Sequence, residues 1–110
     1  MVETKRGYEQ VVKSEQTIKD EIIGHIRSRG GDLSDWYVGI ASDVQDRLFS
    51  DHRVNKENDK WVYRKAASAT VARRIERYFI DTVGTDGGPG GGGETSCFVY
   101  AYRKDDHTNP

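Results

Sequence analysis

The fold is decided by the stretch Tyr37-Val38-Gly39-Ile40-Ala41-Ser42-Asp43-Val44-Gln45-Asp46-Arg47-Leu48. Residues 35–41 are largely aromatic and β-branched, which predicts a short strand buried on at least one side. Ser42 or Asp43 then offers a side-chain oxygen to the free amide groups of a first helical turn. Val44 and Leu48 lie four residues apart, as on the inner face of a helix. A strand is therefore expected to lead directly into a helix that ends near residue 50.

The same patterns predict the other elements. Apolar residues spaced four apart from Val11 to Ile26 predict an amphipathic helix over residues 8–29, which two glycines would end. Residues 61–64 alternate as a short extended segment does, and residues 96–102 predict a final strand with alternating aromatic side chains. Ser68 is expected to cap a helix over residues 69–81. The inner face of that helix would carry Val71, Ala72, Ile75, Phe79 and Ile80.

A glycine-rich segment, residues 84–93, separates the last helix from the last strand. It holds seven glycines and one proline, so neither a helix nor a central strand is expected there. Glycine amide groups can surround a phosphate. The segment lacks the Lys-Ser/Thr pair of a P-loop, however, so a flexible linker is the preferred interpretation.

Length and composition indicate one domain over residues 1–110. With 110 residues, 35% of them hydrophobic and 32% charged, the chain can form one small core. We expect an N-terminal helix within 1–30, a core over 35–102 and a disordered tail over 103–110. The fold class is α/β in the α+β sense: a small, mainly antiparallel sheet of two to three strands covered by three helices. A parallel pair of strands stays an alternative.

The sequence also bounds the location of the protein. No apolar run approaches the roughly 20 residues that cross a bilayer, and the first residues lack the apolar stretch of a signal peptide. Cys97 is the only cysteine, so no internal disulfide can form. A cytoplasmic protein without membrane contact is expected.

Basic residues gather in one part of the chain. The net charge is −1, so the whole-chain field neither attracts nor repels nucleic acid. Residues 60–77 nevertheless contain six basic residues against one acid. A solvated helix face is the ordinary explanation of such a run. The alternative is a nucleic-acid-binding surface formed by Arg64, Lys65, Arg73, Arg74 and Arg77.

The stretch 37–48 resembles the second half of the signature of the GIY-YIG nuclease superfamily. In that signature a Tyr-Ile/Val-Gly strand is followed, eight residues after the glycine, by an arginine on the next helix, and Arg47 takes this position. Glu76 takes the position of the metal-binding glutamate on a later family helix. The resemblance covers residues 37–102, somewhat more than half of the chain, and implies a GIY-YIG-like fold. The opening Gly-Ile-Tyr strand is missing, because residues 24–28 form the end of the predicted first helix.

The resemblance implies a metal-dependent DNA endonuclease that hydrolyses phosphodiester bonds. Glu76 would hold Mg²⁺ or Mn²⁺, Arg47 would bind the scissile phosphate and Tyr37 would support the nucleophile. These residue types suit the chemistry, because a carboxylate-held cation and a guanidinium group stabilise charge on a phosphoryl group. Mg²⁺ keeps most of its waters and commonly takes one or two carboxylates.

Other residues complete the predicted site. The missing strand removes one family tyrosine, which Tyr100 or Tyr102 on the last strand could replace. His52, close after Arg47, is the histidine expected near the site. Taken singly, these residue types more often form aromatic cores or surface ion pairs. The alternative function is a catalytically inactive GIY-YIG-like module that binds nucleic acid or another protein. Separately, the low hydrophobic fraction favours a homodimer, because association would bury apolar surface that a small domain cannot cover itself.

Overall fold

Four strands among the described residues form a single mixed sheet in the order β2-β4-β1-β3. The computed structural model describes residues 11–88 and 93–110. The strands are β1 (Trp36–Ala41), β2 (Trp61–Lys65), β3 (Asp86–Gly87) and β4 (Phe98–Arg103). Strand β4 lies between β1 and β2 and is antiparallel to both, whereas β3 runs parallel to β1.

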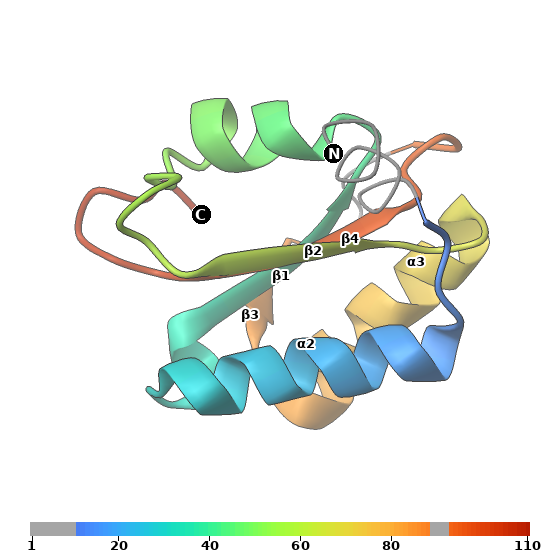
Figure 1. The fold of residues 1–110 in the computed structure, drawn as a ribbon, viewed down its shortest axis with the longest axis horizontal. Helices are drawn as coiled ribbons and strands as arrows, with labels where there is room; N and C mark the ends of the chain where they lie inside the picture. Colours follow the sequence, from blue (N-terminus) through green and yellow to red (C-terminus); the bar gives the residue numbers. More distant parts are fainter. Residues whose placement is uncertain (1–10, 89–92) are drawn as a thin grey trace, which may run out of the picture.

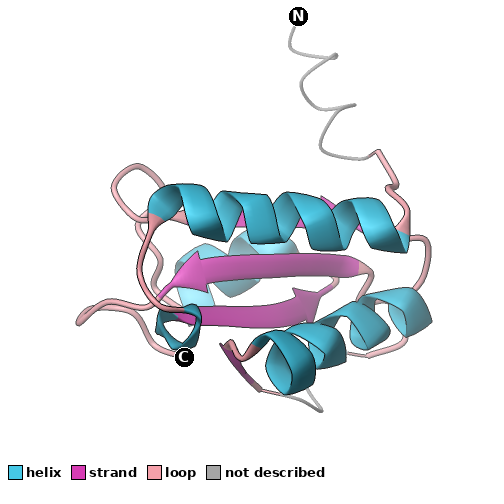
Figure 2. Cartoon of the chain, turned by 90° about the horizontal axis from the view of Figure 1, so that it is seen from below, coloured by secondary structure: helices cyan, strands magenta, loops and turns pink. Residues whose placement is uncertain are grey.

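Helices cover both faces of this sheet (Figure 1). One face carries α2 (Glu15–Arg29) and α3 (Ala69–Arg77), which η3 (Tyr78–Val83) continues with wider turns. The other face carries the wide-turned helix η2 (Asp46–Asp51), drawn in green in Figure 1. Figure 2 looks onto the face that α2 covers. A short turn, η1 (Leu33–Asp35), leads from α2 into β1. The α+β class is confirmed.

The two faces of the sheet have different cores, because successive side chains of a strand point to opposite sides. The face under α2 and α3 is mainly aliphatic, with Val38 and Val99 packing against Ile18, Ile22 and Ile75. The face under η2 is aromatic. Its buried members are Ala41, Val44, Leu48, Val54, Tyr100 and Tyr102.

Within the described part of the chain the sheet has four strands rather than the expected two or three. The additional strand, β3, comprises only Asp86 and Gly87 and lies within the glycine-rich segment. It pairs with Tyr37 and Val38 at the edge of the sheet. A glycine is suited to this position because a side chain on Gly87 would meet Ile80 and the β1 backbone. Residues 89–92 of the predicted linker lie outside the described residues.

The first helix begins later than predicted. Residues 8–10 lie outside the described residues, and α2 starts at Glu15, so its predicted extension back to Val11 was wrong. Ser14 is the N-cap of α2: its hydroxyl oxygen accepts a hydrogen bond from the amide of Thr17 at 3.2 Å, and the helix begins at the next residue. Val11 is exposed and precedes the helix. The predicted end is confirmed, since Gly30 adopts φ +85° and donates to Ile26.

The other predicted caps are confirmed. The hydroxyl oxygen of Ser68 accepts from the amide of Val71 at 3.2 Å, at the start of α3. The carboxylate of Asp43 accepts from the amide of Asp46 at 3.1 Å, before η2. No helix of the described residues has the length and apolar character needed to cross a membrane.

Candidate functional site

An aromatic cluster forms on the η2 face of the sheet. Tyr37 on β1 stacks near Tyr102 on β4, with ring centroids 5.3 Å apart, and lies 6.4 Å from Tyr100. The ring of His52, the residue after η2, lies 4.8 Å from that of Tyr37. Strand register explains the gathering, because Tyr37 is directly opposite Tyr102 and Gly39 is opposite Tyr100. The structure therefore brings together four of the predicted site residues.

His52 is the centre of a hydrogen-bond network. Its Nε2 lies 2.7 Å from the hydroxyl oxygen of Tyr100, and its Nδ1 lies 2.7 Å from the backbone carbonyl of Asn109. The hydroxyl oxygen of Tyr102 is 3.1 Å from the same Nδ1. His52 and both tyrosines are buried. Burial lowers the pKa of His52, against the opposing hydrogen bond to Asn109, which favours a neutral ring.

Arg47 borders this cluster from η2. Its Nε donates to the carboxylate of Asp51 at 3.1 Å, and its guanidinium group also interacts with the hydroxyl group of Tyr100. Burial opposes the charge of Arg47, but the contacts with Tyr100 and Asp51 outweigh burial and raise the guanidinium pKa. Its side chain is 35% exposed. Arg47 can therefore meet a ligand from solvent while contacting the buried phenol.

Glu76 projects from the covered face of α3 and is only 1% exposed. Its Oε1 is buried and has no hydrogen-bond partner among the described residues. Burial raises the pKa of Glu76, although the charges of Arg73 and Arg77 oppose the change. A buried polar atom without a hydrogen bond lowers the stability of a native protein, and such atoms often belong to functional groups. The sequence does indicate this burial, because the spacing of Glu76 places it on one helical stripe with Ala72, Ile75 and Phe79, which are all buried.

The electrostatic field of Glu76 extends to the aromatic cluster. After burial, the charge of Glu76 is the largest influence that raises the pKa of Tyr37. Burial, the neighbouring phenol of Tyr37 and the charge of Glu76 raise the pKa of Tyr100, whereas Arg47 opposes the rise. Burial also raises the pKa of Tyr102. All three phenols are therefore protonated at neutral pH, and only Tyr37 among them is partly exposed.

A single buried carboxylate is a sparse but suitable start for a magnesium site. Glu76 supplies one unpartnered oxygen, and oxygen is the ligand atom that Mg²⁺ and Mn²⁺ prefer. Glu76 belongs to no group of three or more metal-ligating side chains among the described residues. The other ligands of an ion at Glu76 would have to be water or substrate oxygens, which requires this 1% exposed carboxylate to become accessible.

The predicted basic residues do not join the aromatic cluster. They lie on β2 and α3, and most have partners within the chain. Arg64 donates to Glu21 at 2.6 Å and Arg74 to Glu15 at 2.8 Å. Arg77 pairs with Asp81, and the Lys65 amine lies over the ring of Phe98. Arg73 lines a groove together with Arg74 and Arg77.

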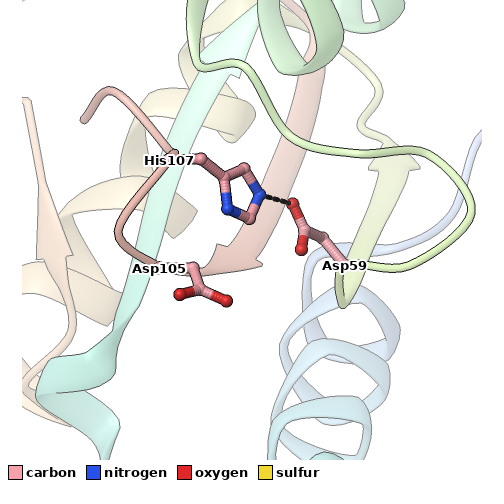
Figure 3. Close-up of side chains that lie close together, drawn as sticks. All are labelled: Asp59, Asp105 and His107. Carbon is pink, nitrogen blue, oxygen red and sulfur yellow. Dashed lines mark hydrogen bonds and ion pairs between the residues drawn. The ribbon is translucent and has the colours of Figure 1, made fainter.

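A second polar group, shown in Figure 3, was not predicted. The carboxylates of Asp59 and Asp105 and the imidazole of His107 place one metal-ligating atom each within 4.8 Å of one another. His107 pairs with Asp59, and this hydrogen bond raises the pKa of His107. The pair is an ion pair between the loop before β2 and the segment after β4. Asp59 is far from the other two residues in sequence, so no spacing could have revealed the group.

The segment after β4 also differs from the disordered tail that we expected. Thr108 donates to the carbonyl of Asp105 at 3.1 Å, and Asn109 donates to the carbonyl of His52 at 2.7 Å. The role of Asn109 was missed because the contact uses backbone atoms, which every residue type possesses.

Comparison with known proteins adds no relative. No family model, curated protein or solved structure matches this chain.

Proposed function

We propose that this protein is a GIY-YIG-like, metal-dependent endonuclease that hydrolyses phosphodiester bonds in DNA. One observation carries the proposal: an aromatic and basic cluster on the η2 face of the sheet is influenced by the charge of a buried carboxylate on α3, which covers the other face. The Oε1 atom of that carboxylate has no hydrogen-bond partner among the described residues. The members of the cluster are Tyr37, Arg47, His52, Tyr100 and Tyr102, with Glu76 as the carboxylate. Buried titratable groups with strongly shifted pKa values are more frequent at catalytic sites than elsewhere.

Arg47 is the residue suited to bind the scissile phosphate. Its planar guanidinium group matches phosphate geometry, and its side chain is partly exposed at the edge of the cluster. Asp51 holds Nε and the hydroxyl group of Tyr100 takes a further contact, so the remaining N–H groups of this partly exposed side chain can reach a ligand. Charge developing on phosphate oxygens would be stabilised there without reorganisation of the side chain.

Tyr100 and His52 are suited to move a proton. The hydroxyl group of Tyr100 lies 2.7 Å from Nε2 of His52, within the range that proton transfer requires. Burial raises the pKa of Tyr100 and lowers that of His52, so the phenolic proton stays on Tyr100 at rest. The guanidinium group of Arg47 opposes the rise and would stabilise a phenolate that forms transiently during catalysis. Tyr37, the partly exposed phenol, would orient the attacking water.

Glu76 would hold the metal ion. A bound Mg²⁺ or Mn²⁺ would supply Lewis-acid stabilisation of the phosphoryl group and of the leaving oxygen. The chain keeps Oε1 of Glu76 buried and without a hydrogen-bond partner among the described residues.

The proposal is tested by nicking of supercoiled plasmid by the purified protein with Mg²⁺ or Mn²⁺. Activity should vanish in Glu76→Gln and Arg47→Ala and persist in Arg77→Ala. Arg77 is a matched control because it pairs with Asp81 in the same i,i+4 geometry, Nε to Oδ2 at 3.1 Å, as Arg47 with Asp51. Absent nicking, or nicking that survives in Glu76→Gln and Arg47→Ala, would refute the endonuclease.

The second candidate is an inactive module that binds nucleic acid through α3. The observation in its favour is an open groove lined by Ala69, Thr70, Arg73, Arg74, Arg77, Gly93 and Glu94. It predicts that a fluorescent DNA duplex binds without cleavage. Replacing Arg73, Arg74 and Arg77 by alanine would weaken binding, and Arg47→Ala would not. Because phosphate contacts release counterions, binding through this groove would also weaken steeply with salt.

A further inference from the structure

The chain returns to His52 after its last strand. Asn109 makes two backbone contacts with this residue: its amide donates to the carbonyl of His52 at 2.7 Å, and its carbonyl lies 2.7 Å from Nδ1 of the ring. The side-chain amide of Asn109 adds a longer contact of 3.4 Å to the carbonyl of Asp51. Backbone atoms of one residue thus hold both the main chain and the ring of His52.

The contact with Asn109 determines which ring nitrogen of His52 carries the proton. A carbonyl oxygen only accepts hydrogen bonds, so a neutral ring facing it must carry its hydrogen on Nδ1. Nε2 is then an acceptor, and the hydroxyl group of Tyr100, 2.7 Å away, must donate to it. The proton of Tyr100 is therefore aimed at a nitrogen that can take it.

Tyr102 would impose the opposite arrangement if Asn109 were absent. Its hydroxyl oxygen is 3.1 Å from the same Nδ1. With the carbonyl removed, Tyr102 could donate to Nδ1, the ring hydrogen would move to Nε2, and Tyr100 would have to accept. Asn109 and Tyr102 thus compete for one atom, and the carbonyl holds the shorter contact.

We propose that Asn109 is a positioning residue that fixes the Nδ1–H tautomer of His52 and so selects Tyr100, not Tyr102, as the proton donor to the ring. The use of this proton in catalysis rests on the proposed function, whereas the tautomer does not. At rest the proton stays on Tyr100; in the transient step that catalysis would use, the O–H bond of Tyr100 breaks and an Nε2–H bond forms. The electron pair stays on the phenolate oxygen beside Arg47, and the imidazolium keeps its Nδ1–H bond to Asn109.

The group in Figure 3 holds the segment that carries Asn109. His107 pairs with Asp59 on the loop before β2, which ties residues 104–110 to a part of the chain distant in sequence. Within the segment, the amide of Asp105 donates to the Thr108 hydroxyl oxygen at 2.9 Å. The ion pair and the turn together set where the Asn109 carbonyl lies.

The test is ¹⁵N NMR of the histidine rings in the full chain, with the His52 signals identified by their loss in His52→Gln. Wild-type His52 should be protonated at Nδ1 and unprotonated at Nε2. Asn109→Pro, which removes the amide and displaces the carbonyl, should shift the proton to Nε2. Asn109→Ala keeps the backbone contacts and should retain the wild-type tautomer.

Two further readings complete the test. Adding Tyr102→Phe to Asn109→Pro removes the competing donor and should restore the Nδ1–H form. A wild-type ring protonated at Nε2, or a tautomer unaffected by Asn109→Pro, would overturn the proposal, and the wild-type spectrum decides even if the proline variant fails to fold. The expected tautomer without nicking would refute only the endonuclease. Nicking by a protein with the opposite tautomer would refute only the role of Asn109.

Discussion

Gly39 and Tyr100 face each other across strands β1 and β4, and the phenol of Tyr100 occupies the space in which a side chain on residue 39 would begin. A methyl carbon at Gly39 would lie 2.5 Å from the Tyr100 hydroxyl oxygen and 2.7 Å from the ring carbon that bears it. This ring is buried under η2, so it could make way for a side chain only by shifting within the core. The glycine of the Tyr-Val-Gly strand therefore admits the phenol to its place beside His52 and Arg47.

Gly39→Ala should accordingly destabilise the protein. Overpacking of a filled core costs about 1–3 kcal/mol, and urea denaturation should show a loss in this range. Gly24→Ala is the control, because nothing lies within 4 Å of its added methyl group and it sits within the exposed side of α2. That change should raise the free energy of unfolding by up to about 1 kcal/mol. Equal stability of the two variants would contradict the packing described here.

The two buried tyrosines should differ in their effect on cleavage. Tyr100→Phe removes the hydroxyl group that faces Nε2 of His52 and Arg47, so nicking should fall by about 100-fold or more. Tyr102→Phe removes the more distant hydroxyl group and should reduce nicking less than about tenfold. The measurement is the initial rate of plasmid nicking. Unchanged activity in the double variant would exclude both phenols from catalysis.

Glu76→Gln should abolish nicking and raise the free energy of unfolding at pH 7. Because burial raises the pKa of Glu76, the folded protein binds this proton more tightly than the unfolded chain. Protonated Glu76 therefore adds to the free energy of unfolding in full below the ordinary glutamate pKa. This stabilisation is lost as the pH rises through the raised pKa of the folded protein. At pH 7 the glutamine variant should be more stable by about 1 kcal/mol.

Urea denaturation at pH 4 and pH 7 would measure this difference. Glu57→Gln is the control, since it makes the same substitution at an exposed position on the loop before β2. A Glu76→Gln variant less stable than the wild type at pH 7 would show that the carboxylate has a stabilising partner.

His25 should make the domain sensitive to mild acid. Burial and the nearby charges of Arg29 and Arg64 lower its pKa to about 4, and its Nε2 has no hydrogen-bond partner among the described residues. Because the folded protein favours the neutral ring of His25, this ring stabilises the fold above about pH 6.5. The stabilisation is lost as the pH falls towards 4 and the ring becomes protonated. Because the ring is only partly buried, the loss should be about 1–2 kcal/mol.

His25→Gln cannot titrate, so its stability should change less between pH 6.5 and 4. Thermal denaturation across this range would measure the difference from wild type. His107→Gln should have the opposite effect, because pairing with Asp59 raises the pKa of His107 and stabilises the protonated ring at low pH. Parallel pH profiles for wild type and His25→Gln would rule out this assignment.

Local signals in the sequence were enough for most of the fold. The strands around Gly39 and Tyr100 and the caps Ser68 and Asp43 were predicted because alternation and capping depend on near neighbours in sequence. The start of α2 was not, because the apolar spacing continues back to Val11 although Ser14 already caps the helix. Strand β3 was missed because two residues at a sheet edge leave no periodic pattern.

The candidate site was predictable where it depends on strand alternation. The aromatic gathering around Tyr37 followed from residues two apart on the last strand and from the histidine after η2. The depth of Glu76 was not expected, because its arginine neighbours suggested a solvated face. The contact between His52 and Asn109 spans 57 residues and uses backbone atoms, so side-chain chemistry in the sequence carried no sign of it.

Strand β4 is central in the sheet although it is the last strand in the chain. Strands β1 and β2 are paired with β4 and not with each other. During synthesis, the ribosome must therefore release residues 98–103 before either strand gains its main partner. Pairings this distant in sequence are slow to form, because a long loop must lose conformational entropy before any contact offsets that loss. A nascent chain halted before residue 98 would expose the apolar faces of α2, α3 and β1, and would be a substrate for chaperones rather than a partly folded domain.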